Sequence, residues 1–279
     1  MDRSKRNAVA RSCGQWSGIR MDQQTVLALF DEQMRRNAQP DDPAARVERI
    51  GGVVRQVGAD ADDWNGVVWS GLDEATVDAA IAAQVDHFTS LGRDFEWKLY
   101  THDTPAGLSG RLLAAGFVSE PAETLMVADI KALGVGAELP AGIRMEPVTD
   151  AAGVERAADV HEQAFGTSAG RLRHRLASQL RGRPETFSMV VAMAGDVPVC
   201  AARMELHPGT DFASLWGGGT LPEWRGRGIY RALVAHRARI AAELGHRYLQ
   251  VDASDQSRPI LQRLGFVPLS TTVPHVFQP

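Results

Sequence analysis

The stretch from Leu215 to Ile240 constrains the fold of this chain more than any other. It reads LWGGGTLPEWRGRGIYRALVAHRARI: a short apolar segment, three glycines, a glycine-and-arginine turn, and a segment rich in Ala, Leu and Val. In the last segment, apolar residues recur at spacings close to multiples of 3.6, which is typical of one face of a helix: Ile229, Leu233, Ile240 and Leu244. The stretch therefore predicts a strand, a turn and a helix, in that order.

The turn between this strand and helix is suited to bind a phosphate. The first backbone N–H groups of a helix have no intrahelical partner and lie at the positive end of its dipole. Gly226 and Gly228 lack the Cβ atoms that would hold an anion away from these amides, and they permit a concave backbone. Arg225 and Arg227 add charge and forked donors. The sequence therefore predicts a site for a pyrophosphate or a similar group.

The segment RGRGIY, from Arg225 to Tyr230, resembles the acetyl-CoA turn of the GNAT N-acetyltransferase superfamily, whose usual pattern is Gln/Arg-x-x-Gly-x-Gly/Ala. As in that family, Pro-Glu-aromatic precedes the turn, and a predicted strand (248–253), a short helix (259–264) and Leu-Gly-Phe follow the long helix. Tyr230 departs from the pattern, because it replaces the last glycine or alanine. We expect its ring to turn away from the turn, since both shaping glycines are intact.

The two halves of the chain repeat one order of motifs, and 279 residues suit two domains. VWSG around Trp69 corresponds to LWGG around Trp216, and LLAAGF ending at Phe117 corresponds to LQRLGF ending at Phe266. We therefore predict an α/β fold with a mixed sheet and two tandem GNAT-like units. Their predicted boundaries are a disordered tail at 1–20, a degenerate unit at 21–133, a linker at 134–142 and a catalytic unit at 143–279.

The first unit lacks the phosphate turn. At the corresponding helix start it carries GLDEATVD, where Asp73 and Glu74 would repel a phosphate. We expect no CoA in this unit. It serves as structural support or as a wall of the substrate pocket, or it is a degenerate ligand-sensing module.

Hydrophobic periodicity and turn residues predict the remaining elements. The predicted helices are 22–36, 73–90, 106–115, 154–165 and 172–180, and the predicted strands are 47–57, 66–70, 95–100, 117–129, 142–148, 187–193 and 197–206. The helix at 172–180 carries several arginines on its polar face. We interpret that face as solvated, with contact to the cofactor's phosphates or to an acidic substrate as the alternative.

The resemblance implies transfer of an acetyl group from acetyl-CoA, as co-substrate, to a primary amine of a small molecule or peptide, by direct attack in a ternary complex. Backbone amides of the central strand would bind pantetheine and polarise the thioester carbonyl. The cofactor-binding residues that it implies are Gly218, Gly219, Thr220, Arg225, Gly226, Arg227, Gly228, Ile229, Tyr230, Arg231, Ser254 and Asp255.

The catalytic residues are less well defined by the sequence. The family's usual proton donor to the thiolate is a tyrosine four residues before the closing Gly-Phe pair, and Leu261 stands there. Tyr230 and Tyr248 are the substitute candidates, and Glu205 and Asp252 are the candidate bases. The loss of the usual tyrosine also favours an alternative, a non-catalytic acyl-CoA-binding protein with a regulatory or sensing role.

Composition narrows the possible partners and compartments. No apolar run is long enough for a transmembrane helix, so we expect no membrane partner. Residues 141–279 carry 16 Lys and Arg against 13 Asp and Glu, an excess too small for a nucleic-acid surface. The two cysteines and the eight histidines show no metal-ligand spacing, so we expect no metal site. The two cysteines stand in unrelated contexts, which suits a reducing, cytoplasmic compartment. Arginine far outnumbers lysine, which together with the many alanines suggests a bacterial protein. We expect a monomer or a homodimer. Translation starts at Met1 or at Met21, because Met21-Asp-Gln-Gln also resembles a natural protein start.

Overall fold

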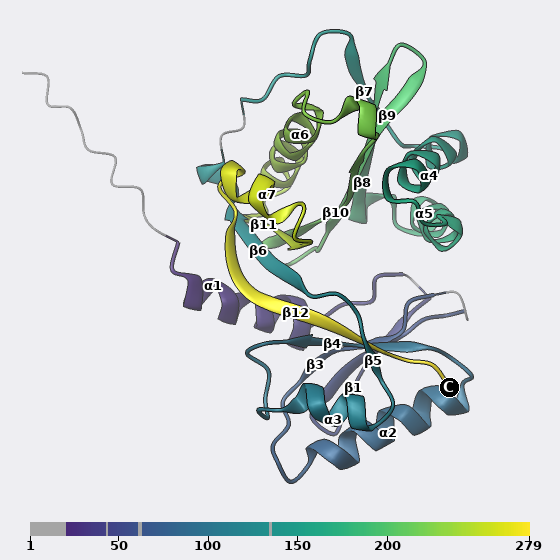
Figure 1. Cartoon of the computed structure of the whole chain (residues 1–279), viewed down its shortest axis with the longest axis vertical. Coiled ribbons are helices and arrows are strands. Elements are labelled where there is room, and N and C mark those ends of the chain that lie inside the picture. Colours follow the sequence, from purple (N-terminus) through teal and green to yellow (C-terminus); the bar gives the residue numbers. More distant parts are fainter. Residues whose placement is uncertain (1–20, 43, 61–62, 134–135) are drawn as a thin grey trace, which may run out of the picture.

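A computed structural model describes residues 21–42, 44–60, 63–133 and 136–279, so the predicted tail at 1–20 lies outside the described residues. The described part contains one twelve-stranded mixed sheet (Figure 1). Across the sheet the order is β1 (Arg46–Ile50), β2 (Val53–Val57), β3 (Gly66–Ser70), β4 (Phe95–Tyr100), β12 (Val267–Phe277), β6 (Glu123–Asp129), β11 (Tyr248–Ala253), β10 (Phe212–Thr220), β9 (Val197–Leu206), β8 (Phe187–Ala194) and β7 (Ile143–Pro147), with β5 (Val118–Ser119) paired to β12.

Helices cover the faces of this sheet. The first half contains α1 (Gln23–Phe30), which continues into the π-helical segment Asp31–Arg36, and α2 (Val77–Ser90) and α3 (Leu108–Ala114); the second contains α4 (Ala151–Phe165), α5 (Gly170–Gly182), α6 (Ile229–Glu243) and α7 (Arg258–Leu264). In the second half α4 and α5 lie on one side of β8 to β10, and α6 and α7 lie on the other (Figure 1). The predicted α/β fold with a mixed sheet is confirmed.

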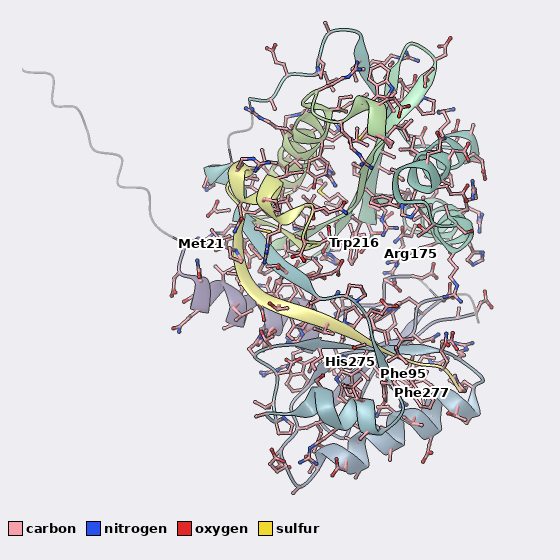
Figure 2. The ribbon with its side chains drawn as sticks, in the orientation of Figure 1. Met21, Phe95, Arg175, Trp216, His275 and Phe277 are labelled. Atoms are coloured by element: carbon pink, nitrogen blue, oxygen red, sulfur yellow. The ribbon has the colours of Figure 1, made fainter. Side chains whose placement is uncertain are left out.

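The two halves exchange their last strands. β6, from the first half, pairs with β11, and β12, from the second half, pairs with β4. β6 and β12 also pair with each other, which joins the halves into one sheet. The C-terminal end of β12 lies in the core of the first half, where the rings of Phe277 and Phe95 are 5.8 Å apart (Figure 2). The boundary at 134–142 stays a prediction, and the strand pairing crosses it.

The parallel strands β10 and β11 separate part-way along their length. They pair from Phe212 to Ser214 on β10, and the pairing ends at Gln250 on β11, although the strands continue to Thr220 and Ala253. On its other side β10 bulges against β9 between Trp216 and Gly219. The result is an opening between the two central strands of the second half.

Four details differ from the sequence predictions. The predicted strand at 117–129 is two strands, β5 and β6. The predicted strand at 47–57 is a hairpin, because Gly51 and Gly52 have φ of +61° and +80° and reverse the chain between β1 and β2. Leu244 is 59 % exposed, since α6 ends before it and the helix buries Val234, Ala238 and Ala241 instead. The eleven-residue strand β12 was not predicted.

Candidate active site

The predicted phosphate turn is open in the structure. Gly226 and Gly228 have φ of +75° and +84°, and apart from its chain neighbours a Cβ on either would have no heavy atom of a described residue within 4 Å. Gly228 precedes α6, and no side chain of a described residue caps this helix, whose first hydrogen bond runs from Ala232 N to Gly228 O at 3.0 Å. The backbone N–H groups of 226–231 donate to no group among the described residues. An anion can therefore approach these amides from solvent.

The arginines of the turn differ in their contacts. Arg225 donates from Nε to the carbonyl of Thr220 at 3.0 Å and from Nη2 to the carbonyl of Ala164 at 3.2 Å, so it ties the turn to the ends of β10 and α4. The guanidinium of Arg227 lies 4.5 Å from the centroid of the Trp224 ring. Arg227 and Arg231 are exposed at the rim of the turn. These two are placed to attract a phosphate.

The Tyr230 ring packs against β10, and the expectation that it turns away from the phosphate turn stays a prediction. A Cβ on Gly218 would lie 2.5 Å from Cε2 of Tyr230, so the ring rests on the backbone of β10. Burial raises the pKa of the Tyr230 phenol. Leu261, which stands where the family's tyrosine is expected, is completely buried in the core that α6 and α7 share. Of these two side chains, only Tyr230 can donate a proton.

The other predicted cofactor residues lie around the opening between β10 and β11. Gly219 is packed closely by α4, since a Cβ there would lie 2.7 Å from Cε2 of Phe165. The Thr220 hydroxyl is 3.1 Å from Sγ of Cys200, and Ile229 is buried and anchors the start of α6. Ser254 and Asp255 are exposed on the far side of the opening, between β11 and α7. The structure thus places these residues on both sides of one gap.

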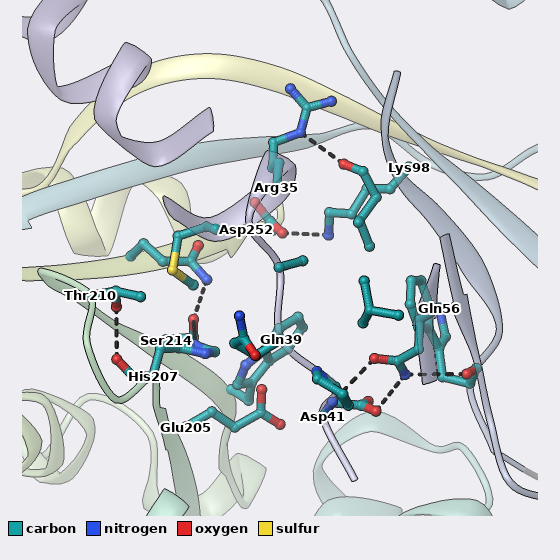
Figure 3. A pocket seen from close by; sticks show the side chains of 18 of the residues that line it. Arg35, Gln39, Asp41, Gln56, Lys98, Glu205, His207, Thr210, Ser214 and Asp252 are labelled. Atoms are coloured by element: carbon teal, nitrogen blue, oxygen red, sulfur yellow. Dashed lines mark hydrogen bonds and ion pairs between the residues drawn. The ribbon is translucent and has the colours of Figure 1, made fainter. Parts of the chain in front are cut away.

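A cavity of about 450 Å³ lies between the two halves (Figure 3). It is lined by α1 and the π-helical segment, β4 and the start of β6 from the first half, and by α5, β9, β10 and β11 from the second. Trp216 and Asp252 line it beyond the point where β10 and β11 separate. The cavity therefore reaches the opening between the strands. The phosphate turn lines neither this cavity nor the smaller one described below.

Lys98 and Asp252 form an ion pair between the halves, with Nζ and Oδ2 2.6 Å apart (Figure 3). Their side chains are 19 % and 4 % exposed. Burial disfavours the Lys98 ammonium, but Asp252, together with Tyr100 and Glu96, raises the pKa of Lys98 well above its usual value. The predicted base Asp252 thus lines the cavity with its charge already compensated.

The predicted base Glu205 is held by two guanidinium groups. Its Oε1 is 2.9 Å from Nη2 of Arg175 and 3.5 Å from Nη2 of Arg203. Burial acts to raise the pKa of Glu205, but these two arginines lower it to about 2. Such a carboxylate is a weak base, so the structure does not favour the proton-accepting role predicted for it. Arg175 lines the cavity, and its helix face is therefore not simply solvated.

Residues 154–266 match the family model described as "Acetyltransferase (GNAT) family". These residues belong to the GNAT family. The resemblance noted for the RGRGIY turn is thereby confirmed. No curated protein matches the chain significantly.

Solved structures extend the likeness to both halves. The chain superposes on a GCN5-related N-acetyltransferase from Kribbella flavida with a TM-score of 0.66 and 22% identity, over 91% of this chain and 95% of that one. With a functionally unknown conserved protein from Staphylococcus epidermidis the TM-score is 0.65 and the identity 14%, over 87% of this chain and 96% of that one. With a tandem GNAT protein from the clavulanic acid biosynthesis pathway the TM-score is 0.59 and the identity 17%, over 91% of this chain and 93% of that one. The tandem GNAT-like fold is confirmed.

Sequence reasoning missed one carboxylate at the GNAT domain. Glu123, on β6 of the first half, lines the large cavity and is half-buried. Burial, and next the charge of Asp252, raise the pKa of Glu123 to about 6. No local motif marks this residue, since it reaches the GNAT domain only through the exchanged strand.

A smaller cavity of about 150 Å³ lies beside the bulge of β10 in the GNAT domain. It is lined by Ala157, His161, Leu172, Met189, Ala201, Arg203, Trp216 and Gly217. Burial lowers the pKa of His161, and Trp216 lines both cavities.

In the described ranges, no helix has the length and apolar character to cross a membrane, and no group of His, Cys, Asp and Glu is arranged to hold a metal ion.

Proposed function

We propose that this chain is an acetyl-CoA-dependent N-acetyltransferase that acetylates a primary amine of a small molecule or peptide. The observation that carries the proposal is the open turn at the start of α6, whose N–H groups at 226–231 are unpartnered among the described residues. It lies next to the opening between β10 and β11, so one molecule can contact both.

The residues present fit acetyl-CoA. The N–H groups of 226–231, with Arg227 and Arg231, would hold the diphosphate. The backbone of β10 from Gly218 to Thr220, beside the Tyr230 ring, would hold the pantetheine arm. Acetyl-CoA supplies an activated acetyl thioester. Backbone amides of the bulged strand would polarise its carbonyl as negative charge develops on the oxygen.

The large cavity suits a cationic acceptor. Among the described residues, its lining has six carboxylates, those of Asp41, Glu96, Glu120, Glu123, Glu205 and Asp252, and four basic side chains, those of Arg35, Lys98, Arg175 and Arg183. An excess of acidic groups around a concave site favours a positively charged ligand. The first half would thus serve as a wall of the acceptor pocket, because it supplies Lys98 on β4 and Glu123 on β6.

Calorimetry with acetyl-CoA, followed by an assay of free-thiol release with a panel of primary amines, tests this proposal. We expect acetyl-CoA to bind and at least one cationic amine to release thiol faster than the amine-free control. Absence of acetyl-CoA binding would refute the proposal.

A second candidate function is acyl-CoA binding without turnover. The complete burial of Leu261 favours it, because the usual proton donor to the thiolate is replaced by a core residue. The same two measurements separate the candidates: acetyl-CoA binding without thiol release from any amine would favour the binding protein over the enzyme.

A further inference from the structure

We propose that Glu123, a residue of the first half, accepts the proton from the acceptor's ammonium group at the active site of the second half. This inference rests on the proposed transferase function. It assigns the catalytic base to the exchanged strand β6, outside the residues 154–266 that match the GNAT family.

The sheet register places Glu123 beside Asp252. In an antiparallel pair, directly opposite residues point to the same face, and side chains alternate along each strand. Asp252 on β11 lies opposite Leu125 on β6, and Glu123 precedes Leu125 by two positions. Glu123 and Asp252 are therefore diagonal neighbours on one face, within reach of each other's charge.

The register on the other side of β6 extends this face into the first half. Glu123 lies opposite Thr272 on β12, and Thr272 lies opposite Tyr100 on β4. Lys98 is two positions from Tyr100 and so shares its face. Lys98, Tyr100, Glu123 and Asp252 all line the large cavity, as this register requires.

Four other carboxylates of the cavity are already engaged. Glu205 is held by two arginines, and Asp252 by Lys98 at 2.6 Å. Glu96 accepts a hydrogen bond from the Trp64 indole at 2.9 Å, and Asp41 is 3.0 Å from the Arg175 guanidinium. The carboxyl group of Glu123 has no hydrogen bond or ion pair with a described residue. It can accept a proton without breaking an existing contact.

The groups around Glu123 make its carboxylate basic enough for this task. Burial has the largest effect, and the charges of Asp252 on β11, Glu96 on β4 and Glu120 before β6 act in the same direction, while Lys98 opposes them. Together they raise the pKa of Glu123 to about 6. A general base is most effective when its pKa lies near the working pH.

The reaction balances with acetyl-CoA as the only co-reactant. The Glu123 carboxylate takes one proton from the acceptor's ammonium group, which leaves a neutral amine, and later releases that proton to water. The amine nitrogen forms a bond to the acetyl carbon, and the carbon–sulfur bond breaks with its electron pair on sulfur. The second nitrogen proton passes to the thiolate, so the products are an amide and free CoA thiol.

Glu123→Gln tests the inference, with Glu185→Gln as its control. Glu185 undergoes the same change, but it is exposed in the 3-10 segment Pro184–Thr186 and lines neither cavity. We expect Glu123→Gln to lower kcat about 100-fold, the usual scale of general-base catalysis. Acetyl-CoA affinity should not change, and Glu185→Gln should keep kcat within about threefold. Wild-type kcat/KM should fall below about pH 6, and Glu123→Gln should lose that dependence.

Glu123→Asp keeps the test decisive if the glutamine variant does not fold, because it retains the carboxyl group and should keep intermediate activity. An active wild type with an unchanged kcat in Glu123→Gln, or with a flat kcat/KM between about pH 5 and 8, overturns this inference alone. A wild type that releases no thiol with any amine overturns the proposed function, and this inference with it.

Discussion

The ion pair between Lys98 and Asp252 gives the sharpest prediction about stability. Lys98→Met removes the cation and leaves a carboxylate whose side chain is only 4 % exposed. The other oxygen of Asp252, Oδ1, is buried and has no hydrogen-bond partner among the described residues, so Lys98 is the one group that compensates this charge there. Removing one partner of a buried pair costs about 3–5 kcal/mol. We expect Lys98→Met to lose that much of the free energy of unfolding.

Such a loss is large compared with the free energy of unfolding of a typical protein, which is about 5–15 kcal/mol. In a chain of this size it corresponds to a fall in Tm of about 10 °C. Urea unfolding of the wild type and of Lys98→Met measures it directly. Lys131→Met is the matched control, because Lys131 is exposed, and it should change the free energy of unfolding by less than about 0.5 kcal/mol.

A double variant tests whether the uncompensated charge causes the loss. Adding Asp252→Asn to Lys98→Met removes that charge. We therefore expect the free energy of unfolding of the double variant to exceed that of Lys98→Met alone by about 1 kcal/mol or more. The reasoning is refuted if Lys98→Met costs less than about 1 kcal/mol, or if Asp252→Asn destabilises it further.

Three further predictions concern the active site. Gly228→Trp should abolish acetyl-CoA binding with the fold retained. Gly142→Trp, at another open glycine with φ +79° and therefore with similar backbone strain, should bind normally; equal affinities in calorimetry would contradict the turn assignment. Gly218→Ala should lower stability by about 1–3 kcal/mol, because its Cβ meets the Tyr230 ring, and Tyr230→Ala should relieve that loss in urea unfolding. The pKa of Glu123 is raised from 4.5 to about 6, so ionisation of this carboxyl group opposes folding. At pH 8 the free energy of unfolding of Glu123→Gln should therefore exceed that of the wild type by about 1 kcal/mol in urea unfolding. Near pH 4, where the wild-type carboxyl group is protonated, this difference should vanish.

Local patterns predicted most of the elements around the proposed acetyl-CoA site. The strand, turn and helix between Leu215 and Ile240 follow from apolar spacing and two glycines, and the structure contains β10, the open turn and α6 in that order. The repeat of motifs between the halves predicted the tandem fold. The strand, the turn and the helix depend on residues close to one another in the sequence, the range over which periodicity and turn chemistry act, and the repeat is the same local pattern found a second time.

The acceptor side of the site could not be predicted in the same way. Lys98, Glu123 and Trp216 meet at one cavity only because β6 and β12 exchange places, and an apolar strand such as TLMVA at 124–128 suits either partner equally well. The direction of the Tyr230 ring depends on the space left by Gly218, a contact between separate elements. Propensity does not encode such long-range pairings.

The exchanged strands also bear on how this chain is made. Tyr100 and Val267 belong to adjacent strands of the sheet but are 167 positions apart in the sequence, so the ribosome completes β4 long before it completes β12. Until then β4 presents an uncovered row of backbone donors and acceptors, which is a template for association with other chains. The N-terminal half thus finishes folding only late in synthesis, and cutting the chain between the halves would leave each with an exposed edge.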